Sequence, residues 1–275
     1  MKERFFKMVN LGIKQFSDPY YQGFAAQLSF YFLLSIVPIL ILISQILSMI
    51  FKQDLEDAVG WLMDYFGNSP MAQQIEGLVL GSGSGSGAMS IVFVVVAIWA
   101  ASRAQFSLMR ITNFTFTEGQ STGRGFIWDR IRAMKTMAMI LIIIIFAIVV
   151  LMYGNVILKL ALKVFGKEAA AGQIWLILRW PIAIVLYFFM ISYIYYVLPS
   201  EKVKYKDIIP GSVFAAVGLL LVTAIYSKYV ASVANYNVLY GSLATIVALL
   251  FWFYFLAWVL GLGVLFNKVW DDTKK

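Results

Sequence analysis

Few side chains in this sequence could act as nucleophiles, general bases near neutral pH or soft metal ligands. The 275 residues include neither cysteine nor histidine. This excludes thiol nucleophiles, disulfides, Cys/His zinc sites and Ser-His-Asp triads. A Gly-rich phosphate loop of the Walker type is absent too, which argues against ATP hydrolysis by this chain. We therefore expect no cofactor, no metal and no catalytic residue, and the candidates that remain are arginines, carboxylates and small polar side chains.

Arg103 is the strongest candidate for a binding role, because it lies beside Ser102, Gln105 and Ser107 at the end of a long uncharged stretch. On a helix Ser107 shares the face of Arg103, and a guanidinium fork fits a phosphate in a way that an ammonium cannot. This pattern predicts contact with an anionic group inside a polar cavity. Two blander interpretations stay open. Arg103 could reach back to the membrane surface, and the small polar side chains could bond neighbouring helices.

The elements that must position these residues follow from the composition. Hydrophobic residues make up 61% of the chain, charged residues only 13%, and the mean hydropathy is +0.83. A soluble protein is about 45–50% apolar and about 25% charged, and a membrane-spanning helix needs about 20 mostly apolar residues. The uncharged intervals predict an all-α, polytopic membrane protein with six transmembrane helices near 27–50, 88–109, 137–158, 176–198, 211–230 and 241–266.

The positive charges predict the orientation of these helices. Most of the 22 Lys and Arg residues fall in residues 1–26, in the connections after the second and fourth helices, and in the tail 267–275. Because such residues favour the cytoplasmic side, both termini are expected in the cytoplasm. The transmembrane domain then covers residues 27–266, with the external segment 51–87 including an alternating Gly/Ser stretch that has a linker's composition.

Two stretches have the pattern of helices that lie in the headgroup layer. In the cytoplasmic N-terminal segment 1–26, and again in 124–135, apolar residues recur at roughly helical spacing among Lys and Arg. Anionic lipid headgroups are their expected partners at this basic face. We expect no nucleic acid as a partner, and formation of a homo-oligomer stays open.

Four stretches, 28–40, 98–113, 198–211 and 236–254, resemble successive signatures of the YihY/BrkB family of bacterial inner-membrane proteins. The resemblance spans nearly the whole chain. It implies six transmembrane helices, cytoplasmic termini, and a protein historically labelled ribonuclease BN or a serum-resistance virulence factor, with lipid-related transport among the proposed activities.

The family motifs carry over to particular residues of this sequence. With the neighbours of Arg103 they give a candidate substrate-binding set, Arg103, Ser102, Gln105, Ser107 and Asn113. The candidate structural positions are Pro38, Pro210, Gly211, Tyr236, Asn237, Tyr240, Gly241 and Ser242. The sequence departs from the family pattern at Val264, Leu265, Phe266 and Asn267, where the family commonly has an acid, so a mechanism that needs this carboxylate is in doubt.

Three functions compete. Transport or translocation of a lipid or amphipathic substrate fits the apolar spans, which contain no carboxylate for a proton relay. A scaffold for envelope assembly that transports nothing is the alternative. A ribonuclease is least favoured, because metal-dependent cleavage needs clustered carboxylates, and the cluster Asp54, Glu56 and Asp57 is predicted outside the cell. We expect a protein that is not an enzyme.

Overall fold

The computed structural model describes residues 2–50, 87–163, 171–232 and 242–273. These ranges contain helices and no strand, so the all-α expectation is confirmed. The helices are α1 (Lys2–Phe16), α2 (Pro19–Ile50), α5 (Gly87–Phe116), α6 (Phe126–Lys163), α7 (Ala171–Val197), α8 (Tyr205–Ser232) and α10 (Ser242–Asp272). Six of them, all except α1, are long and apolar enough to cross a membrane, as expected.

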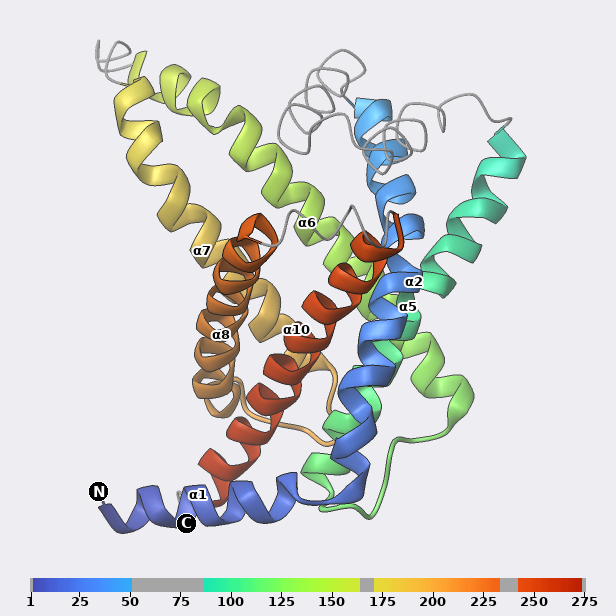
Figure 1. Cartoon of the computed structure of the whole chain (residues 1–275). Coiled ribbons are helices and arrows are strands. Elements are labelled where there is room, and N and C mark those ends of the chain that lie inside the picture. Colours follow the sequence, from blue (N-terminus) through green and yellow to red (C-terminus); the bar gives the residue numbers. More distant parts are fainter. Residues whose placement is uncertain (1, 51–86, 164–170, 233–241, 274–275) are drawn as a thin grey trace.

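The six long helices form one bundle, and α1 lies across one end of it (Figure 1). We call this the α1 end. Both α1 and the end of α10 lie there, so the two described ends of the chain are on the same side (Figure 1). A tight corner connects α1 to α2. The Asp18 carboxylate accepts a hydrogen bond from the Tyr20 N–H at 2.9 Å, and Pro19 occupies the first turn of α2, where no N–H is needed.

Small residues allow the helices to pack closely near the α1 end. The fully buried positions include Ala25 in α2, Ala101 in α5, Ala133 in α6, Ala215 in α8 and Ala257 in α10. Such residues let helix backbones approach each other where no hydrophobic effect drives association in lipid. By contrast, most residues from 172 to 190 of α7 are exposed or half-buried, and they lie toward the opposite end of the bundle (Figure 1).

Several helices extend beyond their expected boundaries. The stretch 124–135 does not form a helix of its own, because residues from Phe126 onward are the first turns of α6. Likewise α10 continues to Asp272, through most of the expected tail. The expected external segment 51–87 lies outside the described residues except for Gly87, which begins α5.

Candidate functional site

Helix α5 carries all five candidate binding residues, but it does not present them to one place. The side chains of Ser102, Gln105, Ser107 and Asn113 are buried, whereas Arg103 is exposed. The structure therefore separates the arginine from the polar residues that were expected to share a cavity with it. A ligand role for any of the five stays a prediction.

The three buried neighbours of Arg103 differ in their hydrogen bonds. The Ser102 hydroxyl donates to the Trp99 carbonyl oxygen at 2.7 Å, a bond within one turn of the same helix. Gln105 Oε1 and Ser107 Oγ are buried and have no hydrogen-bond partner among the described residues. Since a buried polar atom without a partner is costly, these two are the positions where a water molecule or ligand would be accommodated.

Asn113 joins two connections at the α1 end. Its Nδ2 donates to the Thr122 carbonyl oxygen at 3.2 Å, and its Oδ1 accepts from the Ser200 N–H at 2.7 Å. The first partner lies between α5 and α6, and the second lies between α7 and α8. Both the amide nitrogen and the amide oxygen of Asn113 are therefore used to connect the α5–α6 connection to the α7–α8 connection.

Asp129 and Arg132, which the sequence did not single out, extend this polar network. The buried Asp129 accepts from the Arg124 N–H at 2.8 Å and lies 3.6 Å from the Arg132 guanidinium. Arg132 in turn donates to the carbonyl oxygens of Val197 and Pro199 at 2.9 and 2.8 Å. It also donates to the Ser200 hydroxyl at 3.0 Å. Arg132 thus binds carbonyls that the end of α7 leaves without an intrahelical partner.

Pro210 and Gly211 lie in the second turn of α8, where that helix meets α10. The Gly211 N–H donates to Oδ1 of the buried Asn267 at 2.6 Å. A Cβ atom on Gly211 would overlap the Gly263 carbonyl oxygen and the Asn267 side chain. Asn267 stands in the segment where the family pattern commonly has an acid, and here its amide oxygen binds a backbone N–H.

The other candidate structural positions are only partly described. Pro38 lies inside α2, and Ser242 is the first residue of α10. Tyr236, Asn237, Tyr240 and Gly241 lie outside the described residues. The acidic cluster Asp54, Glu56 and Asp57 does so as well, and among the residues that are described no three acids gather at one place.

The exposed Arg103 lies next to a second arginine that comes from α6. Arg130 packs on α5 against residues one turn before and one turn after Arg103, and the two positive charges disfavour each other. Its Nη2 donates to the Trp99 carbonyl oxygen at 2.7 Å, and its guanidinium lies over the Trp99 and Phe106 rings. Sequence reasoning missed this pair, because only the packing of α6 on α5 brings Arg130 there.

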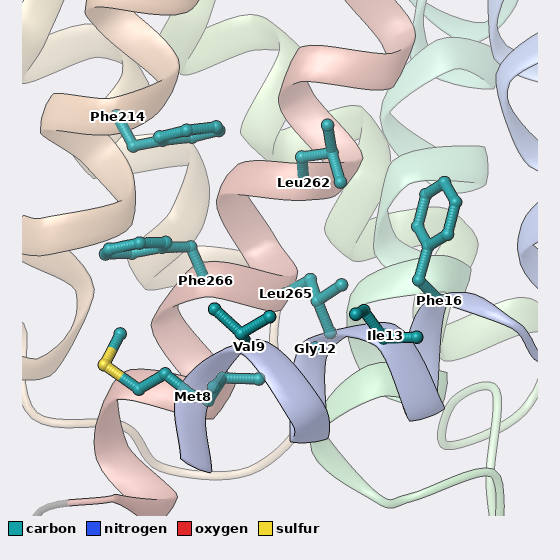
Figure 2. A pocket seen from close by; sticks show the side chains of 10 residues that line it. Met8, Val9, Gly12, Ile13, Phe16, Phe214, Leu262, Leu265 and Phe266 are labelled. Atoms are coloured by element: carbon teal, nitrogen blue, oxygen red, sulfur yellow. The ribbon is translucent and has the colours of Figure 1, made fainter. Parts of the chain in front are cut away.

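An open apolar groove of about 340 Å³ lies between α1 and the bundle. Figure 2 shows Val9, Ile13 and Phe16 of α1 on the side that faces α10, with Phe214 of α8 and Phe266 of α10 across the groove. Its complete lining is Met8, Val9, Gly12, Ile13, Phe16, Phe214, Leu262, Leu265, Phe266 and Val269. None of these side chains could bind a polar solute by charge or hydrogen bonding.

Comparison with known proteins identifies a family and a relative that match most of the chain. The family model described as "Virulence factor BrkB" matches residues 13–275. The putative ribonuclease-like protein YfkH of Bacillus subtilis is 28% identical over 256 residues, covering 92% of this chain and 91% of YfkH.

Shorter matches involve proteins described as UPF0761 membrane proteins. The one from Albidiferax ferrireducens is 36% identical over 80 residues, which is 28% of this chain and 19% of the relative. One from Stenotrophomonas maltophilia is 35% identical over 99 residues, or 36% of this chain and 23% of the relative. No solved structure shows a significant match.

Proposed function

This chain belongs to the BrkB virulence-factor family of membrane proteins, and we propose that it transports or translocates a lipid or another amphipathic substrate in the bacterial cytoplasmic membrane. The observation that carries the proposal is the apolar groove beside α1 (Figure 2). A water-soluble solute needs polar contacts in its site, whereas an acyl chain needs only apolar surface. The groove fits an acyl chain.

The position of the groove also supports a lipid. Helix α1 carries the exposed cations Lys7 and Lys14 and an apolar face that lines the groove. A helix of this kind lies at the boundary between headgroups and acyl chains, so that a groove on its apolar side receives acyl chains from the bilayer. We place the α1 end, and with it both termini, on the cytoplasmic side, because the connections there are rich in Lys and Arg.

The alternative functions require other chemistry. A nuclease needs gathered carboxylates, and the described part of the chain does not bring three acids together. We propose that the protein is not an enzyme, because its clustered acids Asp54, Glu56 and Asp57 are predicted to lie outside the cell, away from RNA, although a relative bears a ribonuclease-like name. An envelope scaffold that transports nothing would not depend on the groove. A substitution that fills the groove should therefore affect a transporter and leave a scaffold unchanged.

The proposal is tested by reconstituting the purified full chain into liposomes of phosphatidylethanolamine and phosphatidylglycerol that contain a trace of fluorescent phospholipid. Dithionite bleaches the label in the outer leaflet only, unless the protein moves lipid between leaflets. We expect bleaching to exceed the outer-leaflet pool with wild-type protein. Gly12→Phe should reduce the rate about tenfold or more, because its ring fills free space in the groove.

The matched control is Asn10→Phe, which places the same ring on an exposed position of α1 outside the groove and should leave the rate unchanged. Equal rates for wild type and Gly12→Phe would remove the groove from the function. A folded wild-type protein that moves no lipid would favour the scaffold instead.

A further inference from the structure

Arg103 is exposed and Arg130 is half-buried where α6 packs on α5. Neither guanidinium takes part in an ion pair with any acid in the described parts of the chain. Arg103 has no hydrogen bond to a described residue, and Arg130 Nε is buried and likewise unpartnered. An anionic group between them would offset the repulsion of these two positive charges.

Arg130 is held in a defined position by two aromatic rings of α5. Arg130 Cζ lies 5.1 Å from the centroid of the Trp99 ring and 5.8 Å from that of Phe106. Phe106 is itself held by Phe126 of α6, with ring centroids 5.9 Å apart. The cation–π contacts and the Trp99 carbonyl fix Arg130 against α5. The side chain of Arg103 is exposed and can reach a ligand that binds beside Arg130.

The pair belongs to a stripe along one face of α5. Trp99, Arg103, Phe106 and Arg110 follow at spacings of four, three and four residues, which places them above one another on a helix. Aromatic rings and guanidinium groups therefore alternate from the middle of α5 toward the α1 end. Arg130 joins this stripe from the neighbouring helix.

The side chains near the pair are apolar and exposed, which indicates that this surface faces lipid. The exposed large hydrophobic residues nearby in sequence are Val95, Val96 and Trp99 on α5, and Phe126, Ile127 and Ile131 on α6. In a membrane protein such a surface faces acyl chains. A phosphate that reaches these arginines would arrive attached to acyl chains more readily than alone.

The pair lies some distance along the bundle from the level of α1. Phe114 stacks on Tyr20 at the α1–α2 corner, with ring centroids 4.3 Å apart, so it marks the level of α1. Arg103 precedes Phe114 by eleven residues, which is about 16 Å along the helix at 1.5 Å per residue. An arginine at this depth is costly unless it is hydrated or paired.

We propose that Arg103 and Arg130 together bind the phosphate ester of a membrane lipid at the lipid-facing seam between α5 and α6. The Arg103 fork binds phosphate oxygens from one side, and Arg130 adds the Nη N–H groups that its bond to the Trp99 carbonyl leaves available, with the Trp99 and Phe106 rings beside them. The acyl chains stay in the bilayer against the exposed apolar residues. This goes beyond the proposed function, because the seam is a second lipid site apart from the groove beside α1, and a binding measurement tests it separately from translocation.

The test measures binding of fluorescent phosphatidylglycerol to the purified full chain in detergent, beside diacylglycerol with the same acyl chains and label. We expect phosphatidylglycerol to bind about tenfold more tightly than diacylglycerol, or better, because only its phosphate can accept charge-assisted hydrogen bonds from the arginines. Arg103→Gln should lose that preference. Because Arg103 makes no contact that the fold needs, this variant should elute and melt like wild type.

Arg103→Lys keeps the charge and should still lose most of the preference, since an ammonium lacks the fork. The matched control is Arg179→Gln, which removes another exposed arginine within a span, on α7, and should bind as wild type does. Equal binding of the phosphatidylglycerol and the diacylglycerol by wild type, or full preference in Arg103→Gln, would overturn the site. Displacement by millimolar glycerol 3-phosphate would keep the phosphate chemistry but overturn the lipid as its source.

Discussion

A methyl group at position 211 has no room, and this one position fixes how closely α8 can approach α10. The Gly211 N–H bonds Asn267, and Gly263 faces Gly211 from α10. On its other side, a Cβ on Gly263 would overlap the Tyr195 hydroxyl, which donates to the Leu260 carbonyl oxygen at 2.8 Å. Three helices therefore meet around two glycines.

Gly211→Ala should destabilise the protein by about 2 kcal/mol or more, because the added carbon meets backbone that cannot rotate away. A thermal unfolding curve of the purified protein in detergent measures the effect as a lower melting temperature. Gly23→Ala is the control, since nothing lies within 4 Å of the Cβ it adds. Equal melting of the two variants would contradict this account of the contact.

The candidate residues could be found from the sequence, but their partners could not. Asn113, Pro210 and Gly211 stand out by resemblance to a family, yet the groups they bond or meet are Ser200 and Asn267, far away in the chain. The Trp-Arg-Phe-Arg stripe of α5 has a periodicity that a sequence reader could notice. Arg130 has no such signal, because its role depends on which helix it packs against.

At the scale of elements, the sequence predicts all six spans but makes most of them too short. The prediction ended each helix near its charged residues. Helix α6 instead begins before Asp129 and Arg132, because the backbone N–H of Arg124 and the carbonyls of α7 satisfy those charges. The helix continues through these charged residues because they have partners, a local one in the Arg124 N–H and a distant one in the Val197 carbonyl.

Arg132→Lys should loosen the end of α7 and the connection that follows it. Arg132 reaches these acceptors from two nitrogens, Nη1 to the Ser200 hydroxyl and Nη2 to the Val197 and Pro199 carbonyls. A single ammonium nitrogen cannot occupy both positions, so we expect a loss of about 1–3 kcal/mol. Proteolysis of the folded protein between residues 198 and 204 should become faster. Arg179→Lys, which changes only an exposed arginine over a Trp180 ring, should leave that rate unchanged.

At the scale of the whole molecule, the structure places α1 and the end of α10 on one side, but which side faces the cytoplasm stays a prediction from charge (Figure 1). The chain has no cysteine, so a thiol reagent that labels a single introduced cysteine reports on which side of the membrane that position lies. In intact cells an impermeant thiol reagent should label Lys163→Cys, at the end of α6, and should not label Gln120→Cys near the α1 end. The opposite pattern would reverse the orientation.

The connection between α5 and α6 has a mechanical consequence for the bilayer. The Phe126 ring packs on Phe106, ten residues before the end of α5, so α6 begins about 15 Å above that end. With α1 at the surface, polar backbone from 117 to 125 then runs along the flank of the bundle, where a bilayer of uniform thickness would place hydrocarbon. The leaflet must thin locally at this flank, and the cost of that dimple grows with acyl-chain length. We therefore expect the lipid composition of the membrane to affect how easily a headgroup reaches the proposed arginine site.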